Sequence, residues 1–148
     1  MRRAGGAIAA AVGRDFQEIG AFPAVGRVLV LAGKGHNGGD ALIAAQAILE
    51  QFPRMRAEVR FAFGSRALRP LAARAWRELV HTAGDRVGVA ADIRGSYELC
   101  LDGIFGFQFR PPADKRVAAL IERANAAAVR LRVAVALPSA ELLRADFT

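Results

Sequence analysis

A glycine-rich run at residues 33–40, Gly-Lys-Gly-His-Asn-Gly-Gly-Asp, constrains the fold of this chain more than any other segment. The apolar run 28–32 precedes it and predicts a buried strand, while residues 41–49, which follow it, have the composition of a helix. The run is therefore predicted to be a turn between a strand and a helix N-terminus. Such a turn presents backbone N–H groups and the positive end of the helix dipole to an anion. Its glycines permit positive φ angles and the close approach of a ligand.

This run does not fully match either common nucleotide-binding fingerprint. Gly33, Gly35 and Gly38 satisfy G-x-G-x-x-G after a strand, but no acidic residue ends a clear second strand to hold a ribose. A P-loop is excluded because no Gly-Lys-Ser/Thr opens the helix. Asn37 and Asp40 add an amide and a carboxylate that a phosphate cradle alone does not require. The alternative is a plain strand-to-helix turn in which Asp40 is only a first-turn charge.

Strands and helices alternate along the rest of the sequence. Helices are predicted at 2–19, 40–51, 67–83 and from 111 to about 129, and strands at 28–32, 57–63, 86–90, 97–102 and 132–137. This alternation is typical of βαβ units and predicts an α/β fold with a mostly parallel sheet. The length of 148 residues fits one domain, residues 1–148.

The charge is unbalanced, with 21 Lys+Arg against 14 Asp+Glu and a formal net charge of +7. Lysine occurs only at Lys34 and Lys115, so the excess is arginine. This composition favours anionic ligands such as nucleotides and permits nucleic acid. We expect the arginines to be dispersed over solvated helix faces instead of forming one basic run: Arg54, Arg56, Arg66, Arg69, Arg74, Arg77, Arg130 and Arg132.

Cysteine content and hydropathy narrow the class of protein. Cys100 is the only cysteine, which excludes an internal disulfide and a cysteine-based metal site, and we expect it to be a core residue. The first twelve residues resemble a secretory signal superficially, but they lack leucine and lead directly into Arg14 and Asp15, so we interpret them as an amphipathic helix. No segment has the length needed to span a membrane. The expected protein is soluble and cytoplasmic.

Three segments whose residues are typical of binding sites each follow a predicted strand, at 33–40, 102–110 and 138–139. Ligands of parallel sheets bind beyond the carboxyl ends of the strands, so we expect these segments to converge on one site. Asp102 could instead have only a turn role, and Phe107 and Phe109 could instead be core residues.

His36 is interpreted as a neutral polar lining residue of this site. Metal binding is the less favoured interpretation, because no second histidine is nearby in sequence and His81 falls on a separate helix. Catalysis by a Ser/His/Asp triad has no support either, because the chain lacks a nucleophile-elbow pattern.

Together these segments resemble the NAD(P)HX epimerase family, the YjeF N-terminal domain. The resemblance covers nearly the whole chain and rests on Ala4-Gly5, on 28–40, on the turn Asp-Gly-Ile-Phe-Gly-Phe at 102–107, and on 133–139. It implies a three-layer α/β/α Rossmann-like sandwich. Because the family's leading residues and final strands are not found in the sequence, we interpret the domain as truncated or incompletely represented.

The resemblance also implies a function in nicotinamide nucleotide repair. The substrate would be a hydrate of NADH or NADPH, and the reaction would interconvert its R and S forms so that a kinase-like dehydratase, fused or separate, can use the S form. A homodimer is a further expected assembly. A potassium ion would be held by Asn37, Asp102 and Ser139, whose side chains supply the oxygen ligands that a hard cation prefers.

The substrate contacts carried over from the family fall on two segments: His36, Asn37, Gly38, Gly39 and Asp40, and Gly106, Phe107, Gln108, Phe109 and Arg110, with the second segment extending to Pro112. Proton transfer next to the hydrated carbon needs a positioned base. Asp40 is the carboxylate of the first segment and is our candidate catalytic residue.

This sequence departs from the family pattern at four positions. His36 stands where the family usually has Asn, and Ala41 stands where it has Gly. The last motif is normally Asp-x-Pro-Ser-Gly, and here Ala136 and Ala140 replace its Asp and its Gly. The missing carboxylate contacts the substrate in the family.

These departures leave a second function open, namely a catalytically impaired domain of the same fold that binds nucleotides or RNA as a scaffold. Eukaryotic mRNA-decapping scaffolds carry a similar domain, and a net charge of +7 would suit RNA. Ala136 favours this alternative, whereas Asn37, Asp40 and Asp102 together favour the epimerase.

Overall fold

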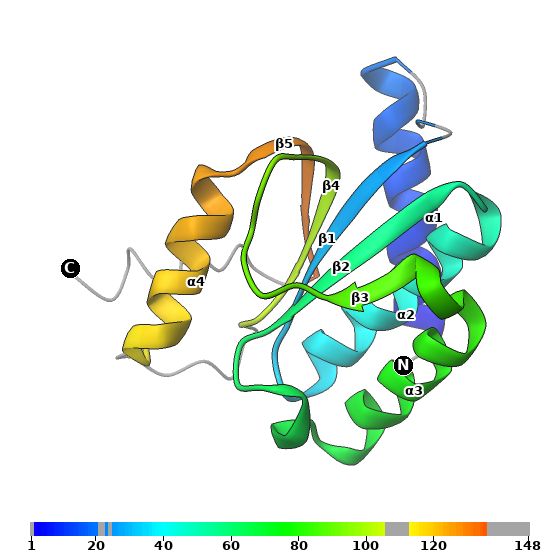
Figure 1. Ribbon diagram of the computed structural model, residues 1–148. Coiled ribbons are helices and arrows are strands. Elements are labelled where there is room, and N and C mark those ends of the chain that lie inside the picture. The colour runs from blue at the N-terminus through cyan, green and yellow to red at the C-terminus, as the bar shows by residue number, and fades with distance from the viewer. Residues whose placement is uncertain (1, 21–22, 24, 106–112, 136–148) are drawn as a thin grey trace.

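The computed structural model describes residues 2–20, 23, 25–105 and 113–135. In this part of the chain a single sheet has the strand order β3-β2-β1-β4-β5, and every pairing is parallel (Figure 1). The strands are β1 (Gly26–Ala32), β2 (Met55–Phe61), β3 (Val87–Val89), β4 (Ser96–Gly103) and β5 (Ala128–Ala134). The predicted α/β class is confirmed. The strand order changes direction between β1 and β4, so the carboxyl ends of these two strands are where a ligand is expected.

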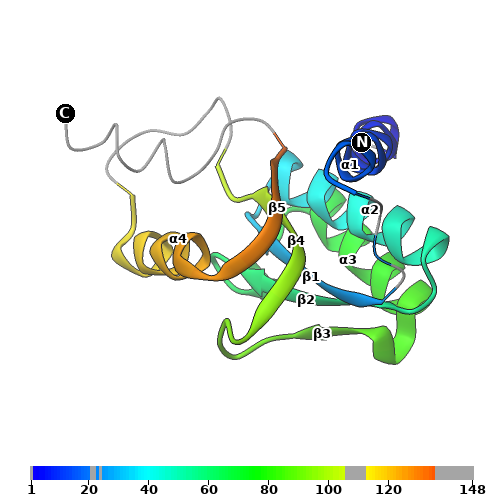
Figure 2. The ribbon, with the colours of Figure 1, turned by 90° about the horizontal axis from the view of Figure 1, so that it is seen from above.

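Helices cover both faces of the sheet and make three layers. The helices are α1 (Arg2–Glu18), α2 (His36–Gln51), α3 (Pro70–Ala83) and α4 (Lys115–Ala126), with short 3₁₀ turns at Ser65–Ala67 and Gly84–Arg86. Helices α1, α2 and α3 lie on one face, and α4 lies on the other (Figures 1 and 2). The predicted Rossmann-like sandwich is confirmed.

Successive residues of β1 are buried on opposite faces, which is why the whole strand is apolar. Val28 and Val30 belong to the core beneath α1, α2 and α3. Leu29 and Leu31 belong to a second core beneath α4. Cys100 lies in this second core and is only 2% exposed, as expected from the sequence, and burial raises the pKa of its thiol to about 12.

The last helix and strand begin and end at different residues from those predicted. Helix α4 ends at Ala126, before the predicted end near 129, and β5 starts at Ala128, where we expected a strand at 132–137. The reason is the guanidinium group of Arg132, which donates to the carbonyl oxygens of Ala124 and Ala127, both at 2.8 Å. A cation that binds the last carbonyls stabilises the end of a helix. The start of this helix, predicted at 111–112, lies outside the described residues.

Several arginines likewise lie elsewhere than on the helix faces where we expected them. Arg56 is in β2, and Arg130 and Arg132 are in β5. Arg86 closes the end of α2, because its Nη1 donates to the carbonyl oxygens of Leu49 at 3.0 Å and Met55 at 3.2 Å. Much of the positive charge thus has a structural role.

None of the helices in the described part of the chain has the length and apolarity that crossing a bilayer requires.

Candidate functional site

Three glycines bring the end of β1, the start of α2 and the end of β4 into direct backbone contact. A Cβ atom at Gly38 would collide with the carbonyl oxygen of Gly33, and one at Gly103 would lie 2.5 Å from the carbonyl oxygen of Asn37. The N–H of Gly33 donates to the carbonyl oxygen of Gly103 at 2.9 Å. None of the three glycines has a positive φ angle. These glycines are needed for the close approach of the backbones, and the freedom to adopt positive φ, which glycine also permits, is not used at these three positions.

The glycine-rich run divides into a short turn and the start of a helix. Helix α2 begins at His36, four residues before the predicted start at 40. Gly35 is its N-cap residue, and the N–H of Gly39 donates to the carbonyl oxygen of Gly35 at 3.0 Å. The N–H groups before this bond have no carbonyl within the helix to bind, as at every helix N-terminus. Our boundary was wrong because glycine disfavours helix, whereas here the contact with β1 requires Gly38 within the helix.

Asp40 lies one turn into α2, on the same side of the helix as His36, because the two are four residues apart. Its side chain is half-buried, whereas His36 is exposed. Burial raises the pKa of Asp40 above its usual value, and the nearby His36 opposes this shift. A raised carboxyl pKa is typical of groups that exchange protons near neutral pH.

Asp102 is the residue before the end of β4, paired with Leu31 of β1 and Ala134 of β5. Its carboxylate accepts the N–H of Ile104 at 3.3 Å, which is the turn role that we weighed as the alternative. The next residue, Gly103, is packed against the backbone of Asn37. The structure therefore brings the segments that carry Asn37 and Asp102 together at the carboxyl edge of the sheet.

Other predicted site residues lie outside the described part of the chain: Gly106, Phe107, Gln108, Phe109, Arg110 and Ser139. Ala136 and Ala140, the two departures in the last motif, lie outside it as well. Their roles stay predictions. Ile104 and Phe105, just before the first of these segments, are each 7% exposed and belong to the core beneath α4. Among the described residues, no group of three or more His, Cys, Asp or Glu side chains could hold a metal ion.

The sequence reasoning missed a pocket at the carboxyl end of β2. Its volume is about 480 Å³, and it is lined by residues 60–64, at the end of β2, and by Asp114, Arg116 and Leu120, at the start of α4. Phe63 is 41% exposed, and the ammonium group of Lys34 lies 4.8 Å from its ring centroid. Lys34 belongs to the glycine-rich run, so this pocket adjoins the predicted site. The sequence signal that could have indicated this pocket was the position of its lining residues 60–64 at the end of the second strand.

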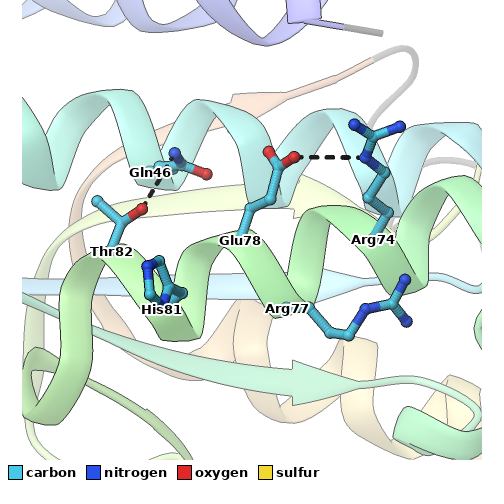
Figure 3. Close-up of a pocket in the computed structure, with 6 residues that line it drawn as sticks. All are labelled: Gln46, Arg74, Arg77, Glu78, His81 and Thr82. Carbon is cyan, nitrogen blue, oxygen red and sulfur yellow. Dashed lines mark hydrogen bonds and ion pairs between the residues drawn. The ribbon is translucent and has the colours of Figure 1, made fainter.

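A second open pocket, of about 530 Å³, lies between α2 and α3 (Figure 3). Its polar side chains pair with one another: Arg74 with Glu78 at 3.4 Å, and Gln46 with Thr82 at 3.4 Å. His81 lines this pocket, on a different helix from His36, as expected. None of the predicted site residues that the structure describes lines it.

The model of the family described as "YjeF-related protein N-terminus" matches residues 1–141. The bifunctional NAD(P)H-hydrate repair enzyme Nnr of Gloeobacter violaceus is 36% identical over 140 residues, which are 94% of this chain and 26% of that protein. The NAD(P)H-hydrate epimerase of Microbacterium testaceum is 40% identical over 119 residues, 77% of this chain and 44% of that protein. That of Bordetella pertussis is 37% identical over 106 residues, 71% of this chain and 44% of that protein.

A solved structure agrees with the fold. The crystal structure of the yeast protein ynu0 matches 94% of this chain and 60% of its own length, with a TM-score of 0.66 and 26% sequence identity. The chain thus spans less than half the length of these three curated relatives and three fifths of this solved structure.

Proposed function

Since this chain belongs to the family of YjeF-related N-terminal domains, we propose that it is an isomerase that interconverts the R and S hydrates of NADH or NADPH. Two curated relatives at 37% and 40% identity carry the name NAD(P)H-hydrate epimerase. The observation that carries the proposal is Asp40, a half-buried carboxylate of raised pKa at the start of α2, beside the junction with β4.

In the proposed mechanism the substrate lies across the carboxyl edge of β1 and β4. The first N–H groups of α2, from His36 to Gly38, bind negatively charged oxygens of the nucleotide. Asp40 takes the proton of the hydroxyl group on the hydrated carbon, the bond from this carbon to the ring nitrogen breaks to leave an aldehyde, and the proton passes to the nitrogen. Closure of the ring on either face of the aldehyde reverses these transfers and gives either configuration. Partial burial makes the carboxylate a stronger base than an exposed aspartate and thereby favours this transfer.

We also propose a potassium ion as the cofactor. Two of its expected ligands fit this role: Asn37 offers an amide oxygen and Asp102 a carboxylate oxygen, and the backbones of the two segments touch at Gly103. One carboxylate balances one monovalent charge, and oxygen ligands suit a hard cation. When bound, the ion would supply fixed positive charge to the site. Ser139, the third expected ligand, lies outside the described residues.

The name of the Gloeobacter violaceus relative supports the expected partner, because that protein is described as a bifunctional repair enzyme. We therefore propose that this chain works with a dehydratase, fused or separate, that uses the S hydrate. The homodimer and the cytoplasmic location stay predictions.

Substitution of Asp40 by Asn tests the proposed function. The separated R and S hydrates of NADPH are incubated with the chain, and their interconversion is followed by chromatography. We expect the wild type to accelerate interconversion and Asp40→Asn to slow it by about 10²–10⁴-fold, because an amide cannot take up the proton. The wild-type assay is repeated with potassium replaced by sodium, and slower turnover is expected.

Asp15→Asn, an exposed substitution on α1 that removes the same charge, is the matched control and should retain wild-type rates. Failure of the wild type to interconvert the hydrates would overturn the proposed reaction. Equal rates for the wild type and Asp40→Asn would remove Asp40 from the mechanism.

The competing RNA-binding function loses part of its support, because some of the arginines that raise the net charge are bound within the fold. Arg27, Arg86 and Arg132 all donate to backbone carbonyl oxygens. An RNA surface needs guanidinium groups that are available to phosphates.

A further inference from the structure

We propose that the pocket at the carboxyl end of β2 binds the adenosine end of the substrate and selects for a 2′-phosphate, so that the hydrate of NADPH is preferred over that of NADH. This inference rests on the proposed function for the identity of the substrate. The pocket itself, its lining and its charge do not depend on the reaction.

The position of the pocket suits the second half of a dinucleotide. Strand β2 lies next to β1, with Phe61 paired to Ala32, and the N–H of Ala62 donates to the carbonyl oxygen of Ala32 at 2.9 Å. Neighbouring strands are about 4.8 Å apart. A dinucleotide whose nicotinamide lies near Asp40 and whose pyrophosphate crosses the turn at Gly33 would therefore place its adenosine at the end of β2. In doubly wound folds the residues after this strand contact the adenosine ribose.

The lining of the pocket provides an aromatic surface. Phe63 is 41% exposed, and such a side chain offers a ring against which an adenine can pack. Lys34, which belongs to the glycine-rich run, makes a cation–π contact with this ring, and its ammonium group lies 4.8 Å from the ring centroid. The contact links the proposed adenosine pocket directly to the proposed pyrophosphate site.

The charges in the pocket favour a phosphate over a free hydroxyl group. Folds that bind a ribose without a 2′-phosphate use an acidic residue near the end of this strand, whereas an arginine nearby accommodates the phosphate. Here β2 ends in Arg-Phe-Ala-Phe-Gly, with no acidic residue, and Arg60 and Arg116 both line the pocket. Arg60 is a fixed charge, because its Nη1 donates to the carbonyl oxygens of Ala90 at 2.7 Å and Ala91 at 2.6 Å.

Among the lining residues that the structure describes, Asp114 is the one that is acidic, and its carboxylate has a structural role. It caps α4 by accepting the N–H of Arg116 at 2.8 Å. Its charge therefore faces the positive end of the helix dipole. The exposed guanidinium group of Arg116 is the group that we expect to contact the 2′-phosphate, because Arg60 is bound to backbone.

Binding of two nucleotide fragments to the 148-residue chain tests this inference. Isothermal titration compares 2′,5′-ADP with 5′-AMP, which differ only in the 2′-phosphate. We expect the wild type to bind 2′,5′-ADP at least about tenfold more tightly, which is the effect of one charge-assisted hydrogen bond. Arg116→Gln should remove most of this preference. Arg77→Gln, an equal charge change on the exposed face of α3, is the matched control and should retain it.

The outcomes separate this inference from the proposed function. Equal or undetectable binding of the two fragments by the wild type, or a full preference retained in Arg116→Gln, overturns the inference even when the hydrates are interconverted. A preference for 2′,5′-ADP that is lost in Arg116→Gln supports it even when no interconversion is observed. In an active chain, the ratio of kcat/KM for the two hydrates should favour the NADPH hydrate, and Arg116→Gln should bring that ratio toward one.

Discussion

At the scale of single residues, Asp40 combines a partly buried position with a charge that the fold does not neutralise well. Burial is the largest cause of its raised pKa, and it outweighs the attraction of the nearby His36. A carboxylate retained in such a position destabilises the folded chain whenever it is ionised. This is the pattern expected of a residue kept for chemistry at the expense of stability.

The stability of Asp40→Asn should therefore depend on pH in a definite direction. The folded chain keeps the Asp40 proton at pH values where the unfolded chain, with a pKa of 3.8, has released it. The contribution of this group to stability accordingly falls as the pH rises through these two pKa values and stays unfavourable at neutral pH.

We expect Asp40→Asn to have a higher melting temperature than the wild type at pH 7, and the difference to shrink as the pH approaches 3.8. Thermal denaturation at a series of pH values measures this. A variant that is less stable than the wild type at pH 7 would show that the carboxylate stabilises the fold, contrary to the sign expected from its raised pKa.

The meeting of the segments that carry Asn37 and Asp102 could be predicted from the sequence, because both segments follow recognisably apolar strands of a parallel sheet. The roles of Asn37, Asp40 and Asp102 in a site stay predictions. Phe63 and Arg116 belong to no motif. They line one pocket because the end of β2 and the start of α4 lie on opposite sides of it, and two segments so distant in the chain leave no local pattern of this in the sequence.

At the scale of elements, the contacts among β1, α2 and β4 require glycine at particular positions. Gly38 is buried within α2, against the backbone of Gly33. Gly13 is also within a helix, α1, but nothing lies within 4 Å of the place where its Cβ would be. These two glycines form a matched pair for testing whether contact or helix propensity dominates.

Gly38→Ala should lower the free energy of unfolding by about 1–3 kcal/mol or more, because the added methyl group forces the backbones apart. Gly13→Ala should raise it by up to about 1 kcal/mol, because alanine favours helix and meets no obstacle. Chemical denaturation of both variants measures the difference. A Gly38→Ala chain as stable as Gly13→Ala would contradict the close contact.

The start of α2 was harder to predict than its existence. Propensity alone places a helix after the glycines, since glycine is unfavourable within helices. Here the tertiary contact at Gly38 outweighs that preference. No local pattern in the sequence indicates that the helix begins at His36.

At the scale of the whole molecule, arginine side chains connect segments that are distant in the sequence, through hydrogen bonds to backbone carbonyl oxygens at the ends of helices. Arg86 joins the segment before β3 to the end of α2, and Arg132 joins β5 to the end of α4. The alternation of strands and helices predicts the α/β class, because it reflects burial patterns within each segment. These hydrogen bonds could not be predicted from the sequence. Each joins an arginine side chain to backbone carbonyl oxygens, and because every residue has a backbone carbonyl, the sequence does not indicate which ones are bound.

We expect Arg86→Ala to lower the free energy of unfolding by about 2 kcal/mol, because half-buried carbonyls at the end of α2 lose a charged donor. Arg77→Ala, an exposed arginine on α3, should change it by less than about 0.5 kcal/mol. Urea denaturation of the two variants measures the contrast. Equal stabilities would show that Arg86 is dispensable for the fold.

The backbone contact of Gly33, Gly38 and Gly103 also limits how this site could be redesigned. The floor beneath the proposed substrate is made of main-chain atoms already touching one another, so no side chain is available there for exchange. A different nucleotide would therefore have to be selected through side chains at the walls, such as Phe63 and Arg116, and not through these three glycines. Libraries directed at Gly33, Gly38 and Gly103 should yield mostly unfolded chains, whereas libraries directed at Phe63 and Arg116 should yield folded chains with altered ligand choice.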